Sequence, residues 1–256
     1  MRIAMPKGRL LEPSLATFAA AGYDVPSEAE LRTRKLVFTR GGIEWLFVKD
    51  CDVPVYVDHG AADAGIAGLD QILEHDCGAI QTVELPFGRC RMMVIGAAGA
   101  PRLSDRSKVA TKYPRIARQY LDSRGVRAEV VTLGGSVELA AVLALTSHVI
   151  DVVETGETVR VHKLELQDFV TEITPRLIVA KNAYRTNNAF VRDLIARVEN
   201  AKYSSSEVGD QSLLAPTGQL RGVATRRCRD IVEERQRSRW PVAACKDWSP
   251  TSEELY

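Results

Sequence analysis

Short apolar runs alternate along this chain with stretches in which apolar residues recur at helical spacing. Near the N-terminus, Leu11, Leu15 and Phe18 lie on one face of a helix that Gly22 closes. Residues 53–57 are either extended or the start of a helix. The runs that predict strands in this part of the chain cover residues 2–5, 45–48, 64–66, 83–85 and 90–95.

The alternation resumes beyond a turn at residues 97–101. Pro114 suits the first position of one helix, and Ser136 is placed to cap another over residues 137–145. The predicted strands here cover residues 109–111, 126–133, 149–153, 169–173 and 177–180. The closing helix has one apolar face, made of Phe190, Leu194, Ile195 and Val198.

Repeated strand–helix alternation favours an α/β fold with parallel sheets and helices on both faces. Because the alternation runs once before and once after the turn near Gly99, we expect two α/β lobes with a cleft between them. From Ser204 onward the composition shifts toward Ser, Gly, Pro and Gln. This shift predicts that residues 204–256 form a partly disordered surface extension rather than another folded domain.

Composition and charge exclude several classes of protein. Of the 256 residues, 45% are hydrophobic and 26% are charged, so wholesale disorder is not expected. The net charge of +1 gives no general attraction to nucleic acid or to an anionic membrane surface. An anionic substrate would therefore have to be met by local positive charge.

Cysteine and histidine usage indicates a reducing compartment and no structural metal. The five cysteines are scattered without a Cys-x-x-Cys pair, and the four histidines lie far apart. Pro6 and Pro13 interrupt any signal-peptide core, and the most apolar stretch, residues 139–145, is too short to cross a bilayer. We therefore expect a cytoplasmic protein.

The strongest candidate for chemistry is the loop 151–158 (DVVETGET), which follows an apolar run and opens a predicted helix. Backbone N–H groups at such a helix start can converge on an anion, and Gly156 permits close approach of a phosphate. Thr155 and Thr158 can add hydroxyl donors, while Asp151 and Glu154 can accept hydrogen bonds from ribose hydroxyls. The alternative is an ordinary capped helix start with acidic residues, such as Glu157, in its first turn.

A basic turn follows the first predicted strand. Lys7, Gly8 and Arg9 lie at the carboxyl end of that strand, where ligands of open α/β sheets bind. A solvated turn explains these residues better when they are taken in isolation. Lys49 is either functional or a surface residue.

Two glycine-rich turns could line the same site. Gly65, Gly68 and Asp70 suit either a tight turn against a ligand or close strand–helix packing. Ser136 and Glu138 belong to a turn that could form a second wall of the site. No turn matches Gly-x-x-x-x-Gly-Lys-Ser/Thr, so the sequence argues against a P-loop ATPase. No nucleophile–histidine–acid arrangement can be identified either.

Six segments, taken in order, resemble the ATP phosphoribosyltransferases, enzymes of the first step of histidine biosynthesis. The resemblance covers roughly residues 1–203. The segments are residues 5–10 (MPKGRL), 52–57 (DVPVYV), 59–70 (HGAADAGIAGLD), 110–114 (ATKYP), 135–139 (GSVEL) and 151–158 (DVVETGET). Each segment is weak alone, but their shared order is highly specific.

The resemblance implies two α/β domains similar to type II periplasmic binding proteins, with the active site in the interdomain cleft. Domain I would comprise residues 1–90 and 175–203, and domain II residues 91–174 with the phosphate loop. In the reaction, N1 of the ATP adenine attacks C1 of phosphoribosyl pyrophosphate (PRPP) and expels pyrophosphate. Mg²⁺ is expected mainly on substrate oxygens, and no residue is assigned as general acid or base.

The resemblance also implies roles for the candidate residues. The segment 154–158 would hold the 5′-phosphate, and Asp151 with Glu154 would orient the ribose. Phosphates of ATP or pyrophosphate would face Lys7, Arg9 and Lys49. The rest of the ATP and pyrophosphate wall would be formed by Gly8, Gly65, Gly68, Asp70, Ser136 and Glu138.

Beside the phosphate loop the chain departs from the family pattern. Ala141 stands where the family usually has proline, residues 144–148 (ALTSH) replace a Gly-Leu-Ala-Asp segment, and residues 161–164 (VHKL) replace Asn-Gly-Leu. The chain resembles the short-form catalytic subunit, since the 53 residues after Tyr203 are too few for a regulatory domain. That form implies a homodimer within a hetero-oligomer that contains a histidyl-tRNA-synthetase-like regulatory subunit.

Two other functions remain open at this point. One is a two-lobed small-ligand binding or sensor module, against which the phosphate loop argues. The other is a catalytically degenerate paralogue with the same fold, which the departures around Ala141, His148 and His162 keep open.

Overall fold

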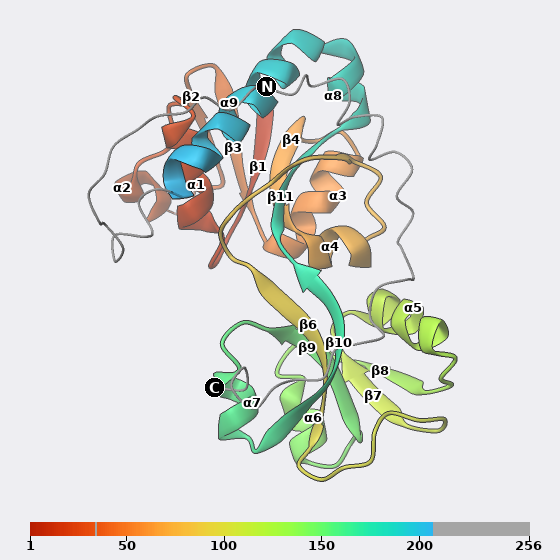
Figure 1. The fold of residues 1–256 in the computed structure, drawn as a ribbon. Coiled ribbons are helices and arrows are strands. Elements are labelled where there is room, and N and C mark those ends of the chain that lie inside the picture. The colour runs from red at the N-terminus through yellow and green to blue at the C-terminus, as the bar shows by residue number, and fades with distance from the viewer. Residues whose placement is uncertain (34, 207–256) are drawn as a thin grey trace, which may run out of the picture. The chain divides into compact units, whose positions relative to one another are not determined.

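The computed structural model describes residues 1–33 and 35–206, and Met1–Ser212 forms one compact unit. This unit contains two β-sheets with associated helices, which we call the first and second lobes (Figure 1). The final helix continues to Ser206, so the predicted linker does not begin at Ser204. The rest of the predicted C-terminal extension lies outside the described residues.

The first lobe is built on a six-stranded sheet with the order β2-β3-β1-β4-β11-β5. Its strands are β1 (Arg2–Pro6), β2 (Val37–Arg40), β3 (Ile43–Val48), β4 (Ala64–Gly68), β5 (Ile80–Glu84) and β11 (Pro175–Val179). Its helices are α1 (Leu11–Ala20), α2 (Glu28–Leu31), α3 (Val53–Asp58), α4 (Leu69–Glu74), α8 (Lys181–Thr186) and α9 (Asn188–Ser206), with a 3₁₀ turn, η1, at Asp50–Asp52.

The second lobe is built on a five-stranded sheet with the order β10-β6-β9-β7-β8. Its strands are β6 (Cys90–Ala97), β7 (Lys108–Thr111), β8 (Glu129–Thr132), β9 (His148–Val153) and β10 (Leu164–Ile173). Its helices are α5 (Pro114–Arg124), α6 (Glu138–Val142) and α7 (Glu157–Val161).

Both sheets are mixed, so the prediction of parallel sheets is only partly right. β1 runs parallel to β3 and β4, and β7 runs parallel to β8 and β9. By contrast, β11 is antiparallel to β4 and β5, and β6 is antiparallel to β9 and β10. Strand–helix alternation predicts that strands exist, but strands from distant segments can enter a sheet in either direction.

The chain passes between the two sheets twice. It leaves the first sheet after β5 and enters the second at β6, and it returns from β10 to β11 through Thr174 alone. The predicted domain boundaries at residues 90/91 and 174/175 stay a prediction, because the two sheets belong to one compact unit.

Most predicted helices begin near the expected residue. Pro114 occupies the first turn of α5, and Gly125 ends it in the left-handed conformation at φ 66°. In α9, Val191, Leu194 and Val198 are fully buried. Residues 53–57, left open by the sequence, belong to helix α3.

The prediction for the helix after Ser136 is wrong in its extent. α6 covers five residues, and Ser136 precedes its N-cap residue, Val137, and makes no side-chain cap. Ser136 has a φ of 48° and Ala144, beyond the end of α6, a φ of 55°. Both are left-handed conformations, which residues other than glycine, asparagine and aspartate adopt only at a cost. The backbone therefore turns where the sequence pattern predicts a longer helix.

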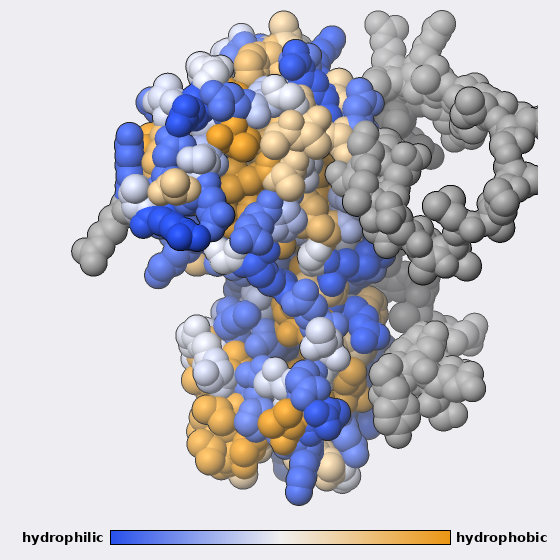
Figure 2. All heavy atoms as spheres, turned by 90° about the vertical axis from the view of Figure 1, so that its left-hand side faces the viewer, coloured by the Kyte–Doolittle hydropathy of each residue, from blue (hydrophilic) through white to orange (hydrophobic). Residues whose placement is uncertain are grey.

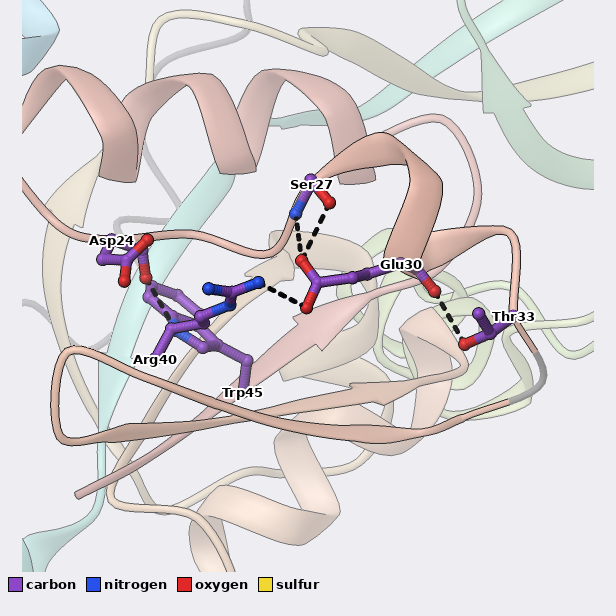
Figure 3. A network of polar contacts seen from close by, with 6 residues as sticks. All are labelled: Asp24, Ser27, Glu30, Thr33, Arg40 and Trp45. Atoms are coloured by element: carbon purple, nitrogen blue, oxygen red, sulfur yellow. Dashed lines mark hydrogen bonds and ion pairs between the residues drawn. The ribbon is translucent and has the colours of Figure 1, made fainter.

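A polar network fixes the edge of the first lobe (Figure 3). The backbone N–H and hydroxyl of Ser27 donate to one carboxylate oxygen of Glu30 at 2.9 and 2.8 Å, and Arg40 donates to the other at 2.6 Å. These hydrogen bonds lower the pKa of Glu30 to about 2. Nearby, the indole N–H of Trp45 donates to the carbonyl of Asp24 at 3.1 Å. The network ties α2 to β2 at a position where neither element was predicted.

Exposed apolar side chains lie on both lobes, and one group of them gathers on the second lobe. Figure 2 shows hydrophobic residues at the surface of this lobe. They come from α6, the turn after it and α7, and comprise Leu139, Val142, Leu143, Leu145 and Val161. Of the helices that the structure describes, none is long and apolar enough to span a bilayer.

Candidate functional site

A basic turn at the end of β1 borders a depression of about 420 Å³ in the surface of the unit. Lys7 is tied to the neighbouring strand, since its N–H donates to the carbonyl of Val48 at 2.8 Å. Gly8 has a φ of 94°, which only glycine adopts readily, and so turns the chain toward α1. Polar residues and glycines make up most of the lining: Lys7, Gly8, Arg9, Asp50, Gly68, Asp70, Gln71 and Gly88.

Asp70, at the start of α4, is held by two side chains at the edge of this depression. The hydroxyl of Tyr113 donates to Asp70 Oδ2 at 2.7 Å, and the amide of Gln71 donates to the same oxygen at 2.9 Å. A Cβ atom on Gly68 would lie 2.2 Å from Asp70 Oδ1. Gly68 is therefore required for this position of the carboxylate.

Tyr113 joins the two lobes and provides a test of this arrangement. Burial raises the pKa of Tyr113, and Asp70 acts in the same direction. Because the folded-state pKa lies above the unfolded value, the phenol stabilises the fold fully below pH about 10 and progressively less above it. Tyr113→Phe is expected to cost about 1–3 kcal/mol at neutral pH, since Asp70 loses a buried donor.

The variant should also lose less stability than the parent chain between about pH 9 and pH 11. Urea unfolding across this range measures both effects. Parallel pH profiles for the two chains would contradict the assignment of a buried, protonated phenol at Tyr113.

The loop 151–158 connects β9 to α7. Gly156 is the N-cap residue of α7 and has a φ of 75°, so the turn depends on a left-handed residue. The N–H of Glu157 points back to the hydroxyl of Thr155 at 3.4 Å, and the Glu157 carboxylate pairs with Arg160 at 2.6 Å. Thr155 and Thr158 are exposed. The loop therefore presents hydroxyls beside a short helix start.

An ion pair joins this loop to the basic turn after β1. Arg9 Nη1 donates to Glu154 Oε2 at 2.5 Å, although the two residues are 145 positions apart. The other arm of the guanidinium donates to the sulfur of Cys90 at 3.4 Å. Burial raises the pKa of the Cys90 thiol, while the neighbouring Arg9 opposes that shift. The two strongest sequence candidates thus meet in space.

Asp151, the first residue of this segment, lies within β9 and is only 7% exposed. Lys112 Nζ is 3.5 Å from Asp151 Oδ1, and the N–H of Val152 donates to the same oxygen at 2.7 Å. Burial raises the pKa of Asp151, and Lys112 partly offsets the increase, whereas the charge of Glu138 adds to it. Glu138 therefore acts on Asp151 through its charge.

Several predicted site residues are placed differently. Gly65 lies inside β4, where an added Cβ would be 2.8 Å from Val53 and 2.9 Å from the carbonyl of Ala4. Packing against α3 accounts for this glycine, as the alternative left open by the sequence predicts, and its place in the ligand wall stays a prediction. Lys49 is exposed beside η1, and neither it nor Ser136 lines the depression.

The structure adds four side chains that were not selected from the sequence. Lys112 pairs with Asp151, Tyr113 and Gln71 hold Asp70, and Cys90 contacts Arg9. Lys112 and Tyr113 belong to the segment ATKYP, whose cation and phenol were the available signal. Gln71 and Cys90 carry no comparable signal, because Gln71 is buried beside Asp70 and the partner of Cys90, Arg9, lies 81 positions away.

Sequence comparisons match this chain to one family of proteins. The family model described as "HisG: ATP phosphoribosyltransferase" matches residues 49–200. ATP phosphoribosyltransferases from Pseudomonas putida (strain W619) and Pseudomonas aeruginosa (strain PAO1) are each 39% identical over 204 residues, covering 78% of this chain and 96% of the relative.

Solved structures give the same result. A chain of the ATP phosphoribosyl transferase (HisG:HisZ) complex from Thermotoga maritima superposes with a TM-score of 0.70 and 29% identity, covering 80% of this chain and 99% of that one. The substrate binding protein of an amino acid ABC transporter, at a TM-score of 0.51 and 10% identity over 82% of this chain and 94% of that one, shares the fold alone. From the family match and the identity to its relatives, this chain belongs to the ATP phosphoribosyltransferase family.

Proposed function

We propose that this chain transfers the phosphoribosyl group of PRPP to N1 of the ATP adenine and releases pyrophosphate, the first step of histidine biosynthesis. The observation that carries the proposal is the contact between Arg9 and Glu154, which joins the basic turn to the loop 151–158. Membership of the family supports the reaction. Both substrates are polyanions, and Lys7 and Arg9 of the basic turn are the cations that can meet them.

The 5′-phosphate of PRPP is assigned to residues 154–158. The left-handed conformation of Gly156 supports this assignment, since it directs the following backbone toward the start of α7. The exposed hydroxyls of Thr155 and Thr158 can donate to phosphate oxygens. Glu157 is partly neutralised by Arg160, which reduces its repulsion of the anion.

The ribose is assigned to Asp151 and Glu154, whose carboxylates can accept from its hydroxyls. Glu154 is paired with Arg9 in this structure, and Arg9 is itself assigned to a phosphate of ATP or pyrophosphate. Binding of the substrates would therefore replace the ion pair between Arg9 and Glu154 by a contact from Glu154 to the ribose and a contact from Arg9 to a phosphate. The depression beside Lys7, Gly8, Gly68 and Asp70 is the assigned place for ATP and pyrophosphate.

For this reaction the protein mainly has to position the two substrates and stabilise the charge that develops. The lone pair of adenine N1 attacks C1 of the ribose, the bond from C1 to the pyrophosphate oxygen breaks, and its electrons leave with pyrophosphate. Adenine N1 carries no proton to remove before attack, so this step requires no general base. Holding the two reactants in line, with Lys7 and Arg9 near the leaving charge, is the expected source of rate enhancement.

Mg²⁺ belongs to the proposal as a substrate-bound ion. Within the described residues, no group of three or more His, Cys, Asp or Glu side chains could hold a metal. Asp151 and Glu154 are each paired with a cation, which fits an ion carried on phosphate oxygens rather than in a protein cage. Such an ion would neutralise charge on pyrophosphate.

A partner subunit completes the proposal. The similar chain from T. maritima was solved in a complex named HisG:HisZ, and we assign this chain an equivalent regulatory partner, with a homodimer of the catalytic chain inside the assembly. A cytoplasmic location goes with the proposal, because both substrates are made and used there.

One assay tests the reaction. The purified chain is mixed with ATP, PRPP and Mg²⁺, with and without the synthetase-like partner, and the ultraviolet change on N1 substitution is followed. The expected result is product formation that requires both substrates. Tight binding of PRPP without turnover under either condition would favour a degenerate paralogue, and binding of an unrelated small ligand alone would favour the sensor module.

A further inference from the structure

A second cavity lies wholly within the second lobe and shares no lining residue with the depression described above. Its volume is about 130 Å³. It is bordered by α5, by β6 and β10, and by the loop before β7, and the side chains used below are Arg102, Tyr120, Arg124, Gln167 and Asp168. No role in the proposed reaction has been given to any of them.

Gln167 is directed by an irregularity of the sheet. Leu166 of β10 pairs with Ile95 and Asp168 pairs with Val94, so Gln167 is an extra residue in a β-bulge. Its amide nitrogen lies where a Cβ on Gly96 would be only 2.4 Å away, and it donates to the carbonyl of Ala100 at 3.4 Å. Bulges often redirect a side chain next to a functional site.

The other amide atom of Gln167 has no partner. Oε1 is buried and accepts no hydrogen bond from any residue that the structure describes. A buried acceptor without a donor costs free energy, so a donor from a bound molecule would stabilise this arrangement.

Asp168 is already saturated. Tyr120 donates to its Oδ2 at 2.6 Å, Arg124 lies 3.0 Å from the same oxygen, and the N–H of Phe169 donates to Oδ1 at 2.9 Å. The charge of Arg124 is therefore matched, whereas the exposed Arg102 makes no ion pair within residues 1–33 and 35–206. Two arginines and one aspartate leave the lining with a net charge of +1.

We propose that this cavity binds a small carboxylate of about three carbons that also carries a hydroxyl or amino group. The carboxylate would pair with Arg102, and the O–H or N–H group would donate to Gln167 Oε1. A cavity of about 150 Å³ is known to hold a benzene-sized molecule, so a volume of 130 Å³ admits about six non-hydrogen atoms. The inference does not depend on the proposed transferase activity.

The test titrates four probes against the full chain by saturation-transfer difference NMR. L-lactate and L-alanine carry both groups, propionate lacks the donor, and 1-propanol lacks the carboxylate. We expect saturable binding of lactate or alanine, with propionate and 1-propanol weaker by about tenfold or more. Which of the first two binds more tightly identifies the donor as a hydroxyl or an amino group.

Two variants of lining residues test whether the ligand binds in this cavity. Arg102→Ala and Gln167→Leu should each weaken binding by about tenfold, while Arg118→Ala, which removes an exposed arginine from α5, should leave it unchanged. Arg102 is exposed, so its variant decides the question even if Gln167→Leu fails to fold. The proposal is overturned if no probe saturates, or if Arg102→Ala weakens binding no more than Arg118→Ala.

Discussion

Replacing Gly156 with valine is expected to lower turnover of ATP and PRPP by at least about 100-fold while the chain still folds. Gly156 has a φ of 75°, a conformation that a β-branched residue adopts only at a cost of about 1–3 kcal/mol. Relief of that strain would rotate the backbone between Thr155 and Thr158. The groups assigned to the 5′-phosphate would then no longer converge on it.

Gly99→Val is a matched control for this substitution. Gly99 lies in the same lobe, has a φ of 72° and has no atom within 4 Å of an added Cβ, while Gly156 has only a side-chain atom at 3.9 Å. Backbone strain is therefore similar in the two variants. Steady-state kinetics with PRPP as the varied substrate, together with urea unfolding, separates the effects. If both valine variants lose activity equally, position in the loop is not what matters and the phosphate assignment is wrong.

Removing the carboxylate of Glu74 is expected to destabilise the chain by about 2 kcal/mol. Glu74 ends α4, yet its oxygens accept from the N–H groups of Arg115 at 3.0 Å and Ile116 at 3.1 Å, in the first turn of α5. Pro114 has no N–H, and Tyr113 makes no side-chain cap. Glu74 is therefore the acidic cap of a helix in the other lobe, where it also matches the helix dipole.

Urea unfolding of Glu74→Ala measures this loss, and Asp76→Asn is the control, since asparagine tolerates the φ of 51° at this position. Asp76 also contacts Arg115, but through an exposed side-chain pair at 2.7 Å, and such pairs contribute about 0–1 kcal/mol. Because α4 also carries Asp70, we expect Glu74→Ala to raise the KM for ATP as well. Equal unfolding midpoints for the two variants would show that the contact from Glu74 to the backbone of α5 adds no stability.

Local features of the fold were largely predictable from the sequence, and long-range features were not. The start of α5 follows from Pro114 and its end from Gly125, because both act through their own backbone geometry. The direction of β11 is different. It is decided by antiparallel pairing with β4, more than 100 residues earlier. The hydrophobic pattern within β11 does not predict whether the strand runs parallel or antiparallel.

The candidate site shows the same division. The glycines at 65 and 68 are three residues apart in one segment, but the first packs against α3 and the second makes room for Asp70. Residue type alone does not distinguish these uses, since the difference lies in what each Cα faces. The contact between Arg9 and Glu154 likewise depends on the folding of both lobes. The sequence predicted each residue separately and could not predict their pairing.

The double passage of the chain between the sheets has a consequence for synthesis on the ribosome. Among the strands that the structure describes, β5 forms hydrogen bonds only with β11, and β11 also pairs with β4. Every strand of the second sheet precedes β11 in the chain and emerges before it. The second sheet can therefore form completely on the nascent chain before the first sheet does. Until residues 175–179 leave the exit tunnel, one edge of β4 stays unpaired.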